Sequence, residues 1–327
     1  MTFVELKDSF GRIHKDLRVS VTDRCNFRCR YCMPEEGLDW TPSEEYLTFD
    51  EITRLVGIFV QHYGFTSVRL TGGEPTLRPG LTNLIEQLRA LGVDLALTTN
   101  GSDLAKKAKA YKAAGLNRLN ISLDTLDADV FYKLTNRDEM SKVTTGIEAA
   151  AAAGFENIKL NAVMMRGVNE SEVLEFIKFG IANNVIVRFI EFMPLEAHGI
   201  WDEASVYSAE EILSDVSQEF DYEEIESGSS PSQKYVLSNG SEFGIIPSVT
   251  NKFCSSCDRV RLTCDGQIRN CLFAQSHLDL RELVRNGCSD AELRSAIETE
   301  VFKKAESHGI GQVNFIRPSK SMSQLGG

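Results

Sequence analysis

Cysteine is the residue type whose placement most clearly indicates chemistry in this chain of 327 residues. Two groups lie near the two ends, Cys25, Cys29 and Cys32 in one and Cys254, Cys257, Cys264 and Cys271 in the other. Cys288 stands apart from both groups. Disulfides are rare in a reducing cytosol, so cysteines that cluster in a chain of this kind indicate metal or redox chemistry.

The first group has the spacing of an iron–sulfur site. Three thiolates within eight residues can bind three irons of a [4Fe–4S] cubane and leave the fourth iron without a protein ligand. Such an open iron can bind a chelating small molecule, and the amino and carboxylate groups of S-adenosylmethionine (SAM) suit that position. The alternatives are a zinc site or three unrelated thiols, although structural zinc sites usually have four ligands.

The second group leaves the identity of its third ligand open. The pair Cys254-x2-Cys257 is followed by both Cys264 and Cys271, and spacing alone does not decide which of them completes a three-thiolate site. A zinc ribbon formed by all four cysteines is the alternative interpretation.

Two arginines follow Cys257 directly. Arg259 and Arg261 are at positions i and i+2 of a predicted strand, so their side chains point to the same face. Guanidinium groups match phosphate oxygens in geometry and charge. Paired surface arginines are usually only solvated, but beside a metal-binding loop in an acidic protein we favour phosphate binding.

A glycine-rich turn, Gly72-Gly73-Glu74-Pro75, follows the second predicted strand. Adjacent glycines allow backbone carbonyls to approach a ligand closely. Glu74 could hold the turn together or accept a hydrogen bond from an ammonium group. The motif gains weight from its position, because it lies at the same end of the predicted sheet as the first cysteine group.

The elements that must position these residues alternate between strand and helix from residue 17 to about 220. Period-two patterns predict strands at 17–21, 68–70, 95–98, 119–123, 158–163 and 185–192. Helical periodicity predicts helices at 50–63, 80–91, 103–114, 141–153, 171–183 and 208–218. Thr48 and Glu51 form a predicted capping box before the first of these helices. Repeated strand–helix units predict a parallel sheet.

The polar positions of these strands predict a barrel rather than a doubly wound sheet. Arg18, Arg69 and Lys159 alternate with apolar residues, whereas strands covered on both faces would be almost continuously apolar. Six units are too few for the usual eight-stranded barrel, so we expect an incomplete (βα)6 TIM-like barrel.

The pattern changes after about residue 225, and we expect two domains, 1–225 and 226–327. Turns at Asn239-Gly240 and Asp265-Gly266 predict hairpins, and helices are expected near 278–286 and 290–305. The second domain is therefore a predicted α+β extension that carries the second cysteine group and ends in Gly326-Gly327.

The formal net charge of −12 argues against a nucleic-acid or membrane-surface partner, because both would repel the chain. A small anionic substrate is compatible if basic residues converge locally. No secretory or transmembrane pattern is evident, which predicts a cytoplasmic location.

These motifs together resemble a known enzyme family. Cys25-x3-Cys29-x2-Cys32 and the following Gly-Gly-Glu-Pro turn are similar to the radical SAM superfamily. The full set resembles the GTP 3′,8-cyclase family of molybdenum cofactor biosynthesis. In order, the set is DLRVSVTDRCNFRCRYC, RLTGGEP, LTTNG, ISLD, RFIEFMP, FCSSCDRVRLTCDGQIRNCLF and the terminal Gly-Gly. Cys264 departs from the family pattern, in which a small polar residue would be expected.

The resemblance implies a specific reaction. SAM would be cleaved reductively, and the 5′-deoxyadenosyl radical would take the ribose C3′ hydrogen of GTP. Attack on guanine C8 would then lead to (8S)-3′,8-cyclo-7,8-dihydroguanosine 5′-triphosphate, with the guanine on the open iron of the second cluster.

The resemblance also assigns residues. It implies one [4Fe–4S] cluster on Cys25, Cys29 and Cys32 and another on Cys254, Cys257 and Cys271. It places Tyr31, Gly73, Ser122 and Met193 on SAM. It places Arg18, Arg69, Thr98, Lys159, Arg259 and Arg261 on GTP, and it brings the Gly-Gly tail into the active site.

An external electron donor and transfer of the product to the next pathway enzyme are further implications, and we expect a monomer or homodimer. Two rival interpretations are a radical SAM enzyme that matures peptides and a non-catalytic iron–sulfur or zinc module.

Overall fold

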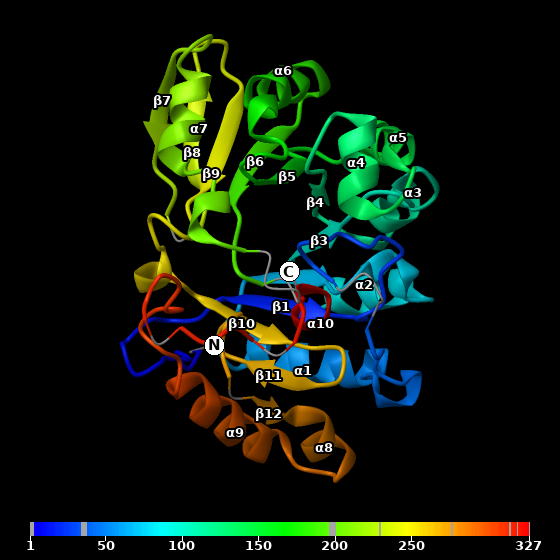
Figure 1. Cartoon of the computed structure of the whole chain (residues 1–327). Helices are drawn as coiled ribbons and strands as arrows, with labels where there is room; N and C mark the ends of the chain where they lie inside the picture. The colour runs from blue at the N-terminus through cyan, green and yellow to red at the C-terminus, as the bar shows by residue number, and fades with distance from the viewer. Residues whose placement is uncertain are drawn as a thin grey trace.

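One curved sheet of twelve strands organises the chain (Figure 1). The structure is a computed structural model that describes residues 3–33, 38–195, 201–228, 230–275, 277–313, 315–318 and 320–326. Along the sheet the strands follow the order β12-β11-β10-β1-β2-β3-β4-β5-β6-β9-β8-β7. The central strands thus keep their sequence order, and strands from the later part of the chain flank them on both edges.

The six central strands form the predicted incomplete barrel. They are β1 (Asp16–Ser20), β2 (Ser67–Thr71), β3 (Asp94–Thr99), β4 (Arg118–Ser122), β5 (Lys159–Met164) and β6 (Ile186–Glu191). Every neighbouring pair among them is parallel. The barrel stays open because β1 and β6 pair with other strands rather than with each other.

Helices connect these strands. They are α1 (Phe49–Gln61), α2 (Leu81–Arg89), α3 (Leu104–Ala114), α4 (Ala128–Thr135), α5 (Met140–Ala152) and α6 (Val173–Asn183). The predicted capping box of Thr48 and Glu51 starts α1, and Gly115 ends α3 in the left-handed conformation. The periodicity did not predict α4, which Asp127 caps. None of the helices in these described ranges is long and apolar enough to cross a membrane.

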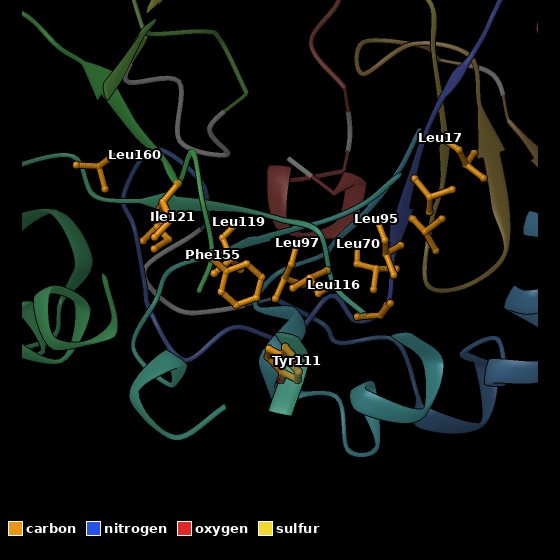
Figure 2. Packing of buried hydrophobic residues seen from close by; sticks show 14 of the residues in the cluster. Leu17, Leu70, Leu95, Leu97, Tyr111, Leu116, Leu119, Ile121, Phe155 and Leu160 are labelled. Atoms are coloured by element: carbon orange, nitrogen blue, oxygen red, sulfur yellow. The ribbon is translucent and has the colours of Figure 1, made fainter. Parts of the chain in front are cut away.

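The core lies between the sheet and these helices. Figure 2 shows leucines of neighbouring strands, such as Leu70, Leu97 and Leu119, together with Tyr111 of α3 and Phe155. All five side chains are at most 5% exposed. Burial of each leucine stabilises the fold by about 1.5–3 kcal/mol. Because strand side chains alternate, this apolar face leaves the polar residues of each strand for the inside of the barrel.

The later part of the chain extends both edges of the barrel sheet. On one edge, β7 (Tyr222–Ile225), β8 (Gln233–Leu237) and β9 (Glu242–Ile246) form antiparallel pairs, and β9 lies parallel to β6. On the other edge, β10 (Arg259–Leu262) lies parallel to β1 and is followed by β11 (Gln267–Arg269) and β12 (Leu278–Asp279). Both hairpins expected from the glycine turns are therefore present.

The other α-helices in the described ranges are α7 (Ala209–Val216), α8 (Leu280–Arg285), α9 (Asp290–Phe302) and α10 (Met322–Leu325). The expected domain boundary after residue 225 lies between the paired strands β7 and β8. The division into domains 1–225 and 226–327 stays a prediction, while the sheet itself runs through both parts.

Candidate active site

Cationic side chains converge on the inner face of the barrel. Arg261 of β10, Arg18 of β1 and Arg69 of β2 lie side by side in the register of these strands. Burial, followed by the nearby positive charge of Arg18, lowers the pKa of Arg188 of β6. Lys159 of β5 lies close enough to Arg188 to be repelled by its charge in the same way. The chain with a net charge of −12 therefore contains a locally basic interior.

The protein compensates these cations only in part: Oδ2 of Asp16 lies 3.9 Å from Nε of Arg18, and the charge of Asp16 acts on both Arg18 and Arg69. Burial, followed by the charges of Arg69 and Arg259, lowers the pKa of Arg18 to about 9. Burial and then Arg188 lower the pKa of Lys159 to about 8. The buried Nε atoms of Arg18 and Arg69 have no hydrogen-bond partner in the part of the chain that the structure describes. Buried cations that repel one another favour an anionic ligand.

Arg188 is a lining residue to which we assigned no role from the sequence. Its guanidinium donates to Oδ1 of Asn161 at 2.9 and 2.6 Å and to Oδ1 of Asn120 at 2.8 Å. Thr98 is the register neighbour of Asn120 on β3. The buried Nδ2 of Asn120 has no partner among the described residues. The signal that could have found this group is the arginine that interrupts the apolar run IVRFIE of β6.

The glycine-rich turn supports the first cysteine loop. A Cβ atom on Gly73 would lie 2.4 Å from the carbonyl oxygens of Asp23 and Arg24, so only glycine fits. The amide of Gly73 donates to the Thr22 carbonyl at 2.8 Å, and the amide of Glu74 donates to that of Arg24 at 2.8 Å. The two segments therefore pack backbone against backbone.

Glu74 holds this turn in place. Its buried carboxylate accepts hydrogen bonds from the amide and hydroxyl of Thr76, the hydroxyl of Thr99 and the amide of Asn100. Of the two roles considered from the sequence, the structure therefore supports the first, because Glu74 joins the ends of β2 and β3.

The first three cysteines share one apolar environment. Burial raises the pKa of Cys25 and of Cys32 to about 12, and it raises the pKa of Cys29 well above its ordinary value. The charges of Cys32 and Cys25 also act on Cys29, which places the three thiols close together. Three thiolates in such surroundings require a compensating positive charge, and bound metal ions keep coordinating thiols deprotonated. The donor set therefore fits an iron–sulfur cluster.

The described residues contain no three His, Cys, Asp or Glu side chains at the spacing of a single metal ion. In a cubane each thiolate binds an iron of its own.

Two of the predicted SAM residues meet beside this loop. Tyr31 and Ser122 line a cavity of about 30 Å³ together with Cys29 and Asp124. The Tyr31 hydroxyl donates to Oδ2 of Asp124 at 2.6 Å, and burial raises the pKa of that carboxyl to about 6. Gly73 lies in the turn that supports the same cysteine loop.

Met193, the fourth predicted SAM residue, does not lie with Tyr31, Gly73 and Ser122. It packs in a separate apolar cluster that includes Cys271 and Met322. The structure thus places Met193 towards the second cysteine group.

The second cysteine group lies at the β10 edge of the barrel. Cys254 begins a short 3-10 turn (Cys254–Ser256), Cys257 precedes β10, and Cys271 follows β11. Burial raises the pKa of Cys257, but the nearby charges of Arg259 and Lys304 outweigh this and lower it to about 6. The loop therefore favours a thiolate, which is the form that binds metals. Sequence reasoning missed Lys304, because no motif surrounds it.

Cys264 lies away from this group. Its side chain is 3% exposed, and burial together with the charges of Asp23 and Asp265 raises its pKa. By contrast, the charges of both Cys271 and Cys257 act on the guanidinium of Arg261. Of the two candidates for the third ligand, the structure brings Cys271 and not Cys264 beside Cys257.

The C-terminal tail enters the barrel, as the resemblance implies (Figure 1). Arg261 donates a hydrogen bond to the carbonyl of Gly326, which is buried. A Cβ atom on Gly326 would lie 2.4 Å from Oγ of Ser20 and 3.0 Å from Cγ2 of Thr71, and its φ of +76° also favours glycine. Gly327 lies outside the described residues.

Comparison with known proteins divides the chain between two families. Residues 19–180 match the Radical SAM superfamily, and residues 185–310 match Molybdenum Cofactor Synthesis C. Among solved structures, Streptococcus suis SuiB bound to S-adenosylmethionine aligns with a TM-score of 0.57 at 15% identity, over 94% of this chain and 76% of that chain. This likeness shows a shared fold.

Curated relatives match almost from end to end. GTP 3′,8-cyclase of Streptomyces coelicolor is 44% identical over 98% of this chain and 96% of its own. GTP 3′,8-cyclase of Rhodopirellula baltica is 45% identical over 99% of this chain and 92% of its own. By identity and coverage, the chain belongs to the GTP 3′,8-cyclase family of radical SAM enzymes.

Proposed function

We propose that this chain cyclises GTP to (8S)-3′,8-cyclo-7,8-dihydroguanosine 5′-triphosphate, the first step of molybdenum cofactor biosynthesis, and consumes SAM. Family membership supports the reaction. The observation that carries it is the convergence of cationic side chains on the inner face of the barrel of an acidic protein, where the Nε atoms of Arg18 and Arg69 have no hydrogen-bond partner among the described residues. A triphosphate supplies the negative charge that this interior lacks.

In this proposal each cation binds a different part of the triphosphate. The Nε atoms of Arg18 and Arg69 have no hydrogen-bond partner among the described residues, and Lys159 adds a charge from β5. Arg259 and Arg261 would approach from β10, beside the second cysteine group. Thr98 completes the predicted GTP contacts from β3. Because guanidinium groups fork, each can bind two phosphate oxygens at once.

SAM would bind at the first cysteine loop, with Tyr31, Gly73 and Ser122 around it. When bound there, the [4Fe–4S] cluster supplies the electron that cleaves SAM into methionine and a 5′-deoxyadenosyl radical. Asp124 fixes the Tyr31 ring by accepting a hydrogen bond from the Tyr31 hydroxyl. Met193 would contact SAM from the side of the second cluster, where it packs with Met322 of the tail.

The second cluster would be held by Cys254, Cys257 and Cys271, which leaves one iron for guanine. Cys257 and Cys271 lie beside Arg261, and Arg259 follows Cys257 on the same strand. This arrangement would hold the base and the phosphates of one nucleotide at neighbouring points of the barrel lining.

We extend the proposal to the surroundings of the enzyme. Cleavage of SAM needs an external electron donor, and the cyclised nucleotide is expected to pass to the next enzyme of the pathway. A cytoplasmic location and a monomeric or homodimeric state remain predictions.

The test is anaerobic incubation of the reconstituted protein with GTP, SAM and a reductant, followed by mass analysis of the nucleotide. We expect a product with the mass of GTP but a changed retention time, formed only when SAM is present. Unchanged GTP alongside full cluster content would refute the proposal.

A further inference from the structure

A buried lysine contacts the second cysteine group. Lys304 is 3% exposed, and its ammonium lies 3.3 Å from Sγ of Cys257. The same nitrogen lies 3.4 Å from the Cys257 carbonyl oxygen and 2.9 Å from that of Arg259. An ammonium has three N–H donors, so these three acceptors use its full capacity.

The charge of Lys304 needs an anion, and the cysteine sulfur is the candidate that it contacts. Within the ranges that the structure describes, Lys304 forms no ion pair with a carboxylate. Its two carbonyl partners are neutral, and its third contact is Sγ of Cys257, a predicted ligand of the second cluster. A buried ammonium without a counter-charge is strongly unfavourable, whereas a thiolate at this distance compensates it.

The end of helix α9 brings Lys304 to this place. Leu293, Ile297 and Val301 of α9 are fully buried, which fixes the helix against the β11 edge of the sheet. The Lys304 amide donates to the Val301 carbonyl at 3.0 Å. A cation at a helix C-terminus is also favoured by the helix dipole.

The same segment is tied to the other two cysteines. Arg12 donates to the carbonyls of Cys254 at 2.8 Å, Ala305 at 2.6 Å and Glu306 at 2.9 Å. Asn270, the neighbour of Cys271 in sequence, donates to the Glu300 carbonyl at 3.0 Å. The backbone on either side of Lys304 is thus linked to the loop of Cys254 through Arg12 and to the loop of Cys271 through Asn270.

We infer that Lys304 is a positioning residue for the second cluster, and that its ammonium holds the Cys257 thiolate and makes the cluster easier to reduce. Hydrogen bonds to sulfur and net charge both set the potentials of iron–sulfur clusters, and a nearby cation stabilises the reduced, more negative form. The inference rests on the second cluster of the proposed function. It does not depend on which nucleotide the enzyme cyclises.

The test measures the cluster directly. Full-length Lys304→Met is compared with Lys303→Met. Lys303 directly precedes Lys304 in sequence, but its side chain is 56% exposed and pairs with Glu300. Both are reconstituted anaerobically and titrated redox-potentiometrically with electron paramagnetic resonance detection. The titrations are repeated with Cys25→Ala, Cys29→Ala and Cys32→Ala in place, so that the signal comes from the second cluster alone.

We expect Lys304→Met to shift the midpoint potential of the second cluster to a more negative value, or to lose roughly half of the protein's iron as that cluster is lost. Lys303→Met should match the unmodified chain. Equal potentials and equal iron contents in the two variants would overturn the inference, whatever the outcome with GTP.

Two further variants separate charge from packing. Lys304→Arg keeps the cation and should keep the potential of the unmodified chain. Lys304→Gln keeps N–H donors without the charge and should show a smaller negative shift than Lys304→Met, and it serves as the test if Lys304→Met does not fold. If Lys304→Arg behaves like Lys304→Met, either because both lose the cluster or because both shift its potential equally, the shape of the side chain matters and not its charge. This result would also overturn the inference.

Discussion

Individual side chains of the barrel lining explain how an acidic protein could hold a polyphosphate. Arg18 and Arg69 were predicted to line the cavity because polar and apolar residues alternate in their strands, and the structure places them side by side. Arg188 and Lys304 were not predicted, because their roles depend on contacts with residues far away in sequence. Periodicity identifies which residues share a face of a strand, but it does not identify the residues that pack against that face.

The arginines of β10 give a prediction about phosphate recognition. Arg259→Ala and Arg261→Ala should each weaken GTP binding by roughly ten- to hundredfold, because a hydrogen bond to a charged group contributes about 1.5–3 kcal/mol. Binding is measured anaerobically by calorimetry with GTP and with guanosine. Guanosine has no phosphates and should be nearly unaffected. Equal losses for both ligands would mean that these arginines support the cysteine loop instead.

The choice between Cys264 and Cys271 gives a second prediction at this scale. Cys271→Ala should lose the second cluster and stop cyclisation, since Cys271 lies with Cys257 beside Arg261. Cys264→Ala should retain both clusters, because Cys264 is buried beside Asp23 and Asp265. Iron and sulfide content and product formation are measured for both variants. Cyclisation retained in Cys271→Ala and lost in Cys264→Ala would contradict the structure.

At the scale of elements, the six strands and the longer helices could be predicted because each carries a regular apolar pattern. Helix α4 was not predicted, although it is as long as the predicted helix α7 and Asp127 caps its start. It nevertheless supports the first cysteine loop. The carbonyl oxygens of Thr135 and Leu134 accept hydrogen bonds from the amides of Arg28 and Arg30 at 2.8 and 3.0 Å.

The packing of the Gly-Gly-Glu-Pro turn on the cysteine loop gives a prediction for elements. Gly73→Ala would place a methyl group 2.4 Å from two backbone carbonyl oxygens, and neither segment can yield without moving the loop. We expect a loss of about 1–3 kcal/mol in stability and a lower content of the first cluster.

Gly57→Ala is the matched control, because Gly57 lies in α1 and no atom of another segment lies within 4 Å of the position that the new methyl group would occupy. It should leave the clusters intact and change stability by about 0.5–1 kcal/mol in the favourable direction. Thermal unfolding and iron content are compared. A Gly73→Ala protein as stable and as iron-rich as Gly57→Ala would refute this account of the turn.

At the scale of the whole molecule, the later part of the chain completes the barrel sheet on both edges. The hairpins themselves could be predicted from their glycine turns. Their pairing could not, because β9 joins β6 and β10 joins β1 through contacts that leave no local pattern. This long-range pairing brings the second cysteine group, which follows the first by more than two hundred residues in sequence, to the same barrel.

The C-terminal tail belongs to the same scale, because it returns to the first strands of the chain. A protein that ends at Leu325 should fold and keep both clusters but lose most of its turnover, since Gly326 lies between Ser20, Thr71 and Arg261. Cluster content, thermal unfolding and nucleotide product are compared with the full-length chain. Most terminal residues are dispensable, so normal turnover in the shortened protein would place this tail among them.

Removal of the C3′ hydrogen of GTP by the enzyme can be followed by isotope transfer. GTP deuterated at C3′ is incubated anaerobically with the reconstituted protein, SAM and a reductant, and the 5′-deoxyadenosine formed is analysed by mass spectrometry. We expect 5′-deoxyadenosine that carries deuterium, together with a cyclised nucleotide that has lost it from C3′. Unlabelled 5′-deoxyadenosine, formed beside a nucleotide product that still carries its C3′ deuterium and so is not joined at C3′, would rule out this reaction.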